Sequence, residues 1–263
     1  SLPMENGFVD CHCHISAHEF EQVSLFFCAN FCIYFLCLCV FFYFVFVFHS
    51  YGALIAPCFG VHPLQSNGGP DKRSVKPQVK LQKLSVIGRD STKLRAVNEI
   101  GLDFTPWFAP SEQEKNDQMK VFVQQLEVAK ELNLPVNVHS RSAAKVTIST
   151  MKEQGVTGAL LHNFAGKLSV AFDGVKAGYF FSFPPAVCTN PQKVKLIKQI
   201  PLEHICLETD SPALGLNKHE RNEPCNISLV CQYIAQIKGL STEAVQFVTS
   251  QNAQRLFTKI NQL

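Results

Sequence analysis

Two histidines separated by one residue, His12 and His14, are the first side chains whose spacing indicates chemistry. They close a short apolar segment, residues 8–14, that reads as a buried β-strand. Because strand side chains alternate between faces, both imidazoles point one way, and Cys11 and Cys13 point to the opposite face as small core residues. Imidazole nitrogen is a good ligand for divalent metals, so the pair predicts a metal site. The alternative is two ordinary surface or hydrogen-bonded histidines.

The same pattern, a polar side chain where an apolar segment stops, recurs along the chain. The segments that read as buried strands are residues 53–59, 93–99, 135–139, 158–162 and 205–210. The side chains at or just past their ends are His62, Glu99, His139, His162 and Asp210. With His12 and His14, seven candidate residues stand at strand ends, which chance explains poorly.

Helices are predicted between these strands. Ser111 and Glu114 have the spacing of a capping box, which opens a helix that Pro135 ends. Further helical segments are predicted at residues 143–154, 167–176, 191–199 and 227–257. Strands that alternate with helices pair in parallel through right-handed crossovers, so the 263 residues predict an α/β fold, a TIM-type (β/α)8 barrel. In such a barrel the functional residues come from the carboxyl ends of different strands.

The candidate residues exceed what one catalytic zinc needs, which is three protein ligands and a water. They are four histidines and two carboxylates, namely His12, His14, His139, His162, Glu99 and Asp210. The economical interpretation is two divalent ions, Mg, Mn or Zn, that share a carboxylate and activate water for a phosphoryl displacement. Arg141 is interpreted as a clamp for a substrate phosphate, against an ion pair at the barrel rim. His62 is a candidate for phosphate binding, against a purely structural role.

Charge and cysteine content limit the class of protein further. A formal charge of +3 gives no strongly basic nucleic-acid surface, so a polyanionic substrate would be held by local groups or metal ions. Eleven cysteines at irregular spacing, without a secretory signal ahead of them, favour reduced thiols and a cytoplasmic or nuclear location. We expect a monomer without a stable protein partner.

Residues 23–50 break the composition, because they contain no Asp, Glu, Lys or Arg and hold nine of the 22 phenylalanines. Residues 25–48 are long enough to cross a bilayer as a helix, at about 1.5 Å per residue against about 30 Å of hydrocarbon. We do not expect insertion. The preceding residues carry acidic and no basic side chains, and a span would separate His12 and His14 from the other candidate ligands.

The chain contains seven short motifs that carry these candidate residues or lie near them. They are Asp10-Cys11-His12-Cys13-His14, Gly60-Val61-His62-Pro63, Glu99-Ile100-Gly101-Leu102-Asp103, His139-Ser140-Arg141, His162-Asn163-Phe164-Ala165-Gly166, Glu208-Thr209-Asp210-Ser211-Pro212 and Arg221-Asn222-Glu223-Pro224. In these motifs the chain resembles the TatD metal-dependent deoxyribonucleases, a branch of the amidohydrolase-like barrel enzymes. The resemblance covers residues 7–13 and 51–263.

The resemblance implies one barrel domain over residues 1–263 that hydrolyses DNA phosphodiester bonds, from a 3′ end, with two metal ions. It implies a ligand set in which one ion takes His12, His14 and Asp210, the other takes His139 and His162, and Glu99 bridges them. Asp210 would also orient or deprotonate the attacking water, so Asp210 and Glu99 are the candidate catalytic residues. Two alternatives stay open: the same metal site acting on another ester or an amide, and an inactive, mis-spliced or membrane-associated product.

The chain departs from the family pattern at two places. Asn98 stands where the family commonly has Gly, and it is expected to crowd the strand beside Glu99 slightly. Residues 23–50 stand where the family has the first barrel helix, the second strand and the second helix, so the second β/α unit is aberrant. Residues 41–47 are the candidate substitute strand, because their composition favours β-structure.

We hypothesise that residues 23–50 are translated intron. Val23-Ser24 can be encoded by GTA-AGT, the usual donor sequence, and His49-Ser50 can end in an acceptor AG. Phe, Leu, Cys, Val and Tyr dominate the segment, and their codons fit a pyrimidine-rich nucleotide sequence. We expect the genomic sequence to carry GT and AG boundaries at these two positions, and codons that lack them would contradict the hypothesis.

Overall fold

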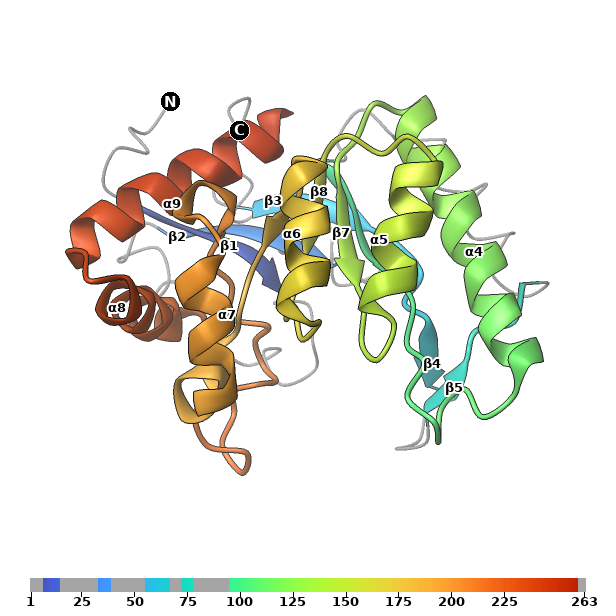
Figure 1. Ribbon diagram of the computed structural model, residues 1–263, viewed down its shortest axis with the longest axis horizontal. Coiled ribbons are helices and arrows are strands. Elements are labelled where there is room, and N and C mark those ends of the chain that lie inside the picture. The colour runs from blue at the N-terminus through green and yellow to red at the C-terminus, as the bar shows by residue number, and fades with distance from the viewer. Residues whose placement is uncertain (1–6, 15–32, 39–54, 67–71, 78–94, 260–263) are drawn as a thin grey trace. The chain divides into compact units, whose positions relative to one another are not determined.

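The computed structural model describes residues 7–14, 33–38, 55–66, 72–77 and 95–259 (Figure 1). The chain divides into two compact units. The terminal unit consists of Ser1–Cys58 together with Phe180–Leu263, and the central unit is Phe59–Tyr179. Each unit combines parallel strands with helices, and the two are described separately below.

The terminal unit begins with parallel strands. They are β1 (Phe8–Cys13), β2 (Ile33–Leu38) and β3 (Ile55–Phe59), which ends where the central unit begins. β2 pairs with β1 on one side and with β3 on the other. The predicted substitute strand, residues 41–47, lies outside the described residues, and β2 takes the second position in the sheet instead. The β1–β2 register shifts between Asp10 and Cys13, which marks a bulge around His12.

The rest of the terminal unit is mostly helical. It contains β9 (Phe180–Phe181), η4 (Pro185–Thr189), η5 (Pro191–Lys193), α7 (Val194–Gln199), η6 (Leu202–His204), η7 (Pro224–Asn226), α8 (Ile227–Lys238) and α9 (Thr242–Leu256). The predicted helical tail, residues 227–257, is two helices. Gly239 ends α8 with a left-handed backbone (φ 66°), and Ser241 caps α9 by accepting a hydrogen bond from the amide of Ala244 at 3.1 Å. α8 and α9 lie side by side, and α9 packs on β1 (Figure 1).

The central unit carries the next strands and helices in alternation. They are β4 (Leu64–Ser66), β5 (Lys72–Ser74), β6 (Ala96–Gly101), α4 (Glu112–Glu131), β7 (Val136–His139), α5 (Ala144–Glu153), β8 (Ala159–Leu161) and α6 (Leu168–Lys176). β7 pairs in parallel with β6 and with β8. β4 and β5 form a separate antiparallel pair.

Helix α4 begins as the sequence predicts. The Glu114 amide donates to Ser111 Oγ at 3.2 Å, and the Ser111 amide donates to Glu114 Oε2 at 3.0 Å, so the capping box is confirmed. The buried face carries apolar side chains but also two glutamines, Gln118 and Gln125. These lie seven residues apart, which places them on one side of the helix.

No described helix is long and apolar enough to cross a membrane. The apolar segment at residues 25–48 is described only at β2, whose six residues form a strand.

Gly101, the last residue of β6, approaches β7 too closely for any side chain. Its φ is +132°, and an added Cβ would lie 2.0 Å from the His139 carbonyl oxygen. We expect Gly101→Ala to lower the free energy of unfolding by about 3 kcal/mol, because the backbone must shift. Gly155 (φ +70°) is the matched control, since its added Cβ meets nothing within 4 Å, and Gly155→Ala should cost about 1 kcal/mol. Urea unfolding measures both changes, and equal losses would contradict this explanation.

Candidate metal centre

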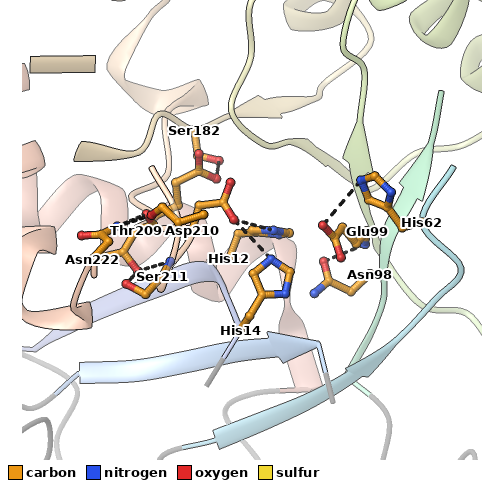
Figure 2. Close-up of polar contacts among 12 residues, drawn as sticks. His12, His14, His62, Asn98, Glu99, Ser182, Thr209, Asp210, Ser211 and Asn222 are labelled. Atoms are coloured by element: carbon orange, nitrogen blue, oxygen red, sulfur yellow. Dashed lines mark hydrogen bonds and ion pairs between the residues drawn. The ribbon is translucent and has the colours of Figure 1, made fainter. Parts of the chain in front are cut away.

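Three predicted ligands come together in the terminal unit, His12, His14 and Asp210 (Figure 2). His14 Nε2 lies 3.2 Å and His12 Nε2 lies 3.6 Å from Asp210 Oδ1. The two imidazole centroids are 5.0 Å apart, and one ligand atom from each residue lies within 4.8 Å of the others. Ligand distances of about 2.0–2.2 Å fit a divalent ion among donors so spaced, and two imidazoles with one carboxylate suit such an ion. The donor set therefore fits the predicted metal.

Residues 205–211 run beside β1 and set this geometry. Three backbone hydrogen bonds join the two segments, from Cys11 N to Leu207 O (2.9 Å), from Asp210 N to His12 O (2.8 Å) and from His14 N to Ser211 O (2.7 Å). The predicted strand at residues 205–210 is thus extended chain that follows β1, and Ile205 pairs in parallel with Phe181 of β9. Cys11 and Cys13 are buried, as expected for core residues.

A buried hydrogen-bond network holds the backbone on both sides of Asp210. Asp10 accepts from the Thr209 amide at 3.0 Å and from the Thr209 hydroxyl at 2.6 Å. Ser211 Oγ donates to Thr209 Oγ1 at 2.7 Å, and Asn222 Nδ2 donates to the Thr209 carbonyl at 2.7 Å (Figure 2). Burial raises the pKa of Asp10 to about 7, although the hydrogen bonds from Thr209 and His12 oppose that rise.

Glu208 precedes this network by one residue. Its carboxylate is fully buried, and Ser182 Oγ donates to Oε2 at 2.6 Å. Glu208 thus makes a hydrogen bond in the interior of the terminal unit.

The two candidate catalytic carboxylates share an unusual backbone. Asp210 and Glu99 both have φ of 57°, the left-handed region that L-residues seldom occupy. Such conformations cost of order 1–3 kcal/mol each and persist only where the surroundings enforce them. Strain of this kind clusters at functional sites, so it supports a shared role for both residues.

Glu99 stands at a bulge in the central unit. The β6–β7 register shifts between Val97 and Ile100, and the Glu99 amide donates to Asn98 Oδ1 at 2.9 Å. Asn98 therefore fixes the backbone at Glu99, rather than only crowding the strand as the sequence suggested. The close approach is accommodated at Gly60, where an added Cβ would lie 1.8 Å from the Asn98 carbonyl oxygen.

His62 contacts the Glu99 carboxylate, with its Nε2 3.7 Å from Oε1 (Figure 2). Burial lowers the pKa of His62 to about 4, despite the opposing charge of Glu99, so the ring is neutral at pH 7. His62 Nδ1 lies 2.9 Å from the Leu64 amide nitrogen and 3.0 Å from the Leu64 carbonyl oxygen, so the backbone of Leu64 holds the ring with Nε2 facing Glu99. Gln125 holds the preceding residue, because its side chain bonds both the amide (2.7 Å) and the carbonyl (3.1 Å) of Val61.

His139 and His162 end neighbouring strands beside Glu99. Their ring centroids are 5.5 Å apart, and a ligand atom of His162 lies within 4.8 Å of a Glu99 oxygen. His139 Nε2 lies 3.0 Å from Asp103 Oδ2, which leaves Nδ1 for a metal. Burial raises the pKa of Asp103, but hydrogen bonds from His139 and Thr105 outweigh it and lower the pKa to about 2. Asp103 is therefore ionised at neutral pH.

Arg141 follows His139 by two residues and is exposed to solvent. Within the residues that the structure describes, no carboxylate contacts its guanidinium, so the alternative of an ion pair at the rim is not observed there. The position suits the predicted phosphate clamp.

Four supporting residues were not assigned a role from the sequence. They are Asp10, Asp103, Gln118 and Gln125. Gln118 accepts from the Asp103 amide at 2.8 Å and donates to the Asp103 carbonyl at 2.9 Å. The sequence contains a signal for three of them, because a carboxylate inside a buried strand, Asp10, and two glutamines on an apolar helix face, Gln118 and Gln125, each need a hydrogen-bond partner.

Comparison with solved structures defines the class of protein. The crystal structure of YJJV, a TatD homolog from Escherichia coli K12, matches with a TM-score of 0.80 and 26% identity, over 95% of this chain and 98% of that one. A TatD family hydrolase from Entamoeba histolytica matches in fold, with a TM-score of 0.79 and 19% identity over 97% and 99% of the two chains. Together with the parallel strands and helices, these matches define the class as TIM-type α/β barrel proteins related to TatD, and the histidine and carboxylate groups are the candidate metal ligands of this chain.

Comparison with known sequences narrows the class to a family. The family model described as TatD related DNase matches residues 9–258, so the chain belongs to the TatD related DNase family. The putative deoxyribonuclease tatdn3 of Danio rerio is 54% identical, over 98% of this chain and 99% of that protein. The deoxyribonuclease TATDN3 of Homo sapiens is 46% identical, over 98% and 97%.

We expect Asp103→Asn to lower the affinity for divalent metal by about 10- to 100-fold, because His139 loses the charged group that orients its ring. Calorimetric titration of metal-free protein with Mn²⁺ or Zn²⁺ measures the change. Asp173→Asn, a substitution of an exposed carboxylate on α6, is the control and should bind as the unaltered protein does. Equal affinity for both variants, with unchanged circular dichroism, would contradict the positioning role of Asp103.

Proposed function

We propose that the chain hydrolyses DNA phosphodiester bonds from a 3′ end with two divalent ions, Mg, Mn or Zn. The observation that carries the proposal is the pair of groups at strand ends, each with imidazoles beside a carboxylate on left-handed backbone. Membership of the TatD related DNase family supports DNA as the substrate. The two-ion count and the 3′ polarity rest on the resemblance to that family.

In this proposal, His12, His14 and Asp210 would hold one ion, His139 and His162 would hold the other, and Glu99 would be the carboxylate that both share. Divalent ions held there would lower the pKa of a water and neutralise charge on the phosphodiester. Glu99 supplies a bridging carboxylate, which favours the nuclease branch over hydrolases acting on other esters or amides.

The side chains have separate tasks in the reaction. Asp210 accepts the proton of the attacking water on its carboxylate, whose direction is set by the Thr209 and Asn222 hydrogen bonds. His62, whose Nε2 lies 3.7 Å from Glu99 Oε1, packs beside that carboxylate and limits its movement. Arg141 binds the phosphate oxygens in bidentate fashion. These roles remain proposals for this chain.

The cysteines support a reducing compartment. Those in the described part of the chain are free thiols, and several of them are buried. We propose a cytoplasmic or nuclear monomer on this basis.

The activity test uses purified protein with 3′- or 5′-end-labelled single-stranded DNA and Mg²⁺, Mn²⁺ or Zn²⁺. We expect metal-dependent release of nucleotides from the 3′ end, and chelator should abolish it. Asp210→Asn and Glu99→Gln should each lower the rate by at least about 100-fold, since each removes a metal ligand and a catalytic carboxylate. The surface substitution Asp173→Asn should leave the rate unchanged.

Two outcomes would contradict the proposal. Cleavage that persists in chelator, or in both carboxylate variants, would exclude the metal mechanism. Absence of DNA cleavage by folded, metal-loaded protein that hydrolyses a small ester or amide would assign the site to another substrate.

A further inference from the structure

Trp107 is the only tryptophan in the chain, and 70% of its surface is exposed. It lies in the loop after β6, four residues beyond Asp103. Burial of a large aromatic ring stabilises a fold, so an exposed ring in the loop after the strand that carries Glu99 suggests that the ring binds a ligand.

Hydrogen bonds within residues 104–109 stabilise the turn that carries Trp107. The Thr105 amide donates to Asp103 Oδ1 at 3.0 Å, and the Thr105 carbonyl accepts from Phe108 N (2.9 Å) and Ala109 N (3.0 Å). Thr105 and Ala109 are buried, so they anchor the turn. Trp107 takes no part in that anchoring, and the ring is presented on a fixed support.

The same turn is tied to the predicted phosphate clamp. The Phe104 amide donates to the Arg141 carbonyl at 3.0 Å, so the loop that carries Trp107 is fastened to the segment that carries Arg141. The two carboxylates in the first turn of α4 are already engaged, Glu112 with Lys115 Nζ at 2.6 Å and Glu114 with Ser111. An exposed guanidinium and an exposed indole thus stand on two linked loops at the ends of neighbouring strands.

We propose that Trp107 is a stacking platform for an unpaired base of the DNA strand whose phosphate binds at Arg141. This inference rests on the proposed function and specifies the substrate as single-stranded DNA or a frayed end, because paired bases bury their faces against one another. Stacking on an aromatic ring is tolerant of sequence, since every base has a π-face. The site therefore binds without base preference, and Arg141 supplies the charge that a nucleotide needs.

The first experiment uses the single tryptophan as its own reporter. Unmodified protein in chelator, which prevents metal-dependent cleavage, is titrated with a single-stranded oligonucleotide and then with the same sequence as a duplex. We expect saturable quenching of the tryptophan emission by the single strand and little by the blunt duplex. Quenching by lipid vesicles and not by DNA would overturn the proposal in favour of a membrane contact.

The second experiment separates stacking from charge. Binding of a labelled single strand, followed by fluorescence anisotropy, is compared for Trp107→Phe, Trp107→Leu and the unaltered protein. We expect Trp107→Leu to weaken binding by about tenfold and Trp107→Phe to weaken it less, because phenylalanine keeps a smaller π-face. Phe247→Leu is the control, since Phe247 is an exposed aromatic residue (56%) on α9, and its affinity should not change.

A DNA strand whose terminal nucleotides lack bases allows the protein change and the DNA change to be combined in a double-mutant cycle. The unaltered protein should bind it about tenfold more weakly than the intact strand, while Trp107→Leu should bind both strands equally. Equal binding of the intact strand by Trp107→Leu and the unaltered protein, or an unchanged preference for bases in the variant, overturns the proposal.

These readouts do not depend on catalysis. Base-dependent binding through Trp107 without cleavage would support the platform and refute the nuclease. If the protein cleaves DNA and Trp107→Leu changes neither binding nor KM, the nuclease is supported and the platform is refuted. If the unaltered protein binds no DNA in either assay, the platform fails, and the cleavage assay alone decides the nuclease.

Discussion

The strained backbone at two carboxylates is the constraint on which the rest of the structure depends. Asp210 and Glu99 both have left-handed φ angles, which disfavour an L-residue, and both follow an extended segment. Each is held by hydrogen bonds next to it, Asp210 through the buried bonds of Thr209 and Asn222, and Glu99 through a part-buried bond to Asn98. A carboxylate aimed in this way is pre-organised, so binding a cation requires little rearrangement.

The second level of support comes from polar side chains placed inside an apolar core. Gln118 on α4 bonds the backbone of Asp103, whose carboxylate contacts His139. Gln125 on the same helix bonds the backbone of Val61, which precedes His62, the residue beside Glu99. A buried amide without partners is costly, so these contacts define the position of the loops as well as stabilise them. Asp103 then orients His139 and also anchors the turn that presents Trp107.

Much of the site follows from simple rules of sequence. Alternation along β1 predicts that His12 and His14 share a face, and the ends of strands predict Glu99, His139, His162 and Asp210 as candidates. The site residues stay predictions, whereas the α/β barrel fold and the capping box of α4 are confirmed. The bulges at His12 and Glu99 could not be predicted, because they depend on register with a neighbouring strand. Nor could β2 at residues 33–38, since residues 23–50 are uniformly apolar and give no periodicity to locate a strand.

The central proposal is that divalent ions bind where imidazoles lie beside a strained carboxylate, at Asp210 and at Glu99. Anomalous scattering from crystals of the protein loaded with Mn²⁺ or Zn²⁺ tests it most directly, since it reports both position and occupancy. We expect one peak bounded by His12, His14 and Asp210 and a second in contact with Glu99, His139 and His162. Peaks elsewhere, or saturating metal with neither position occupied, would contradict the account.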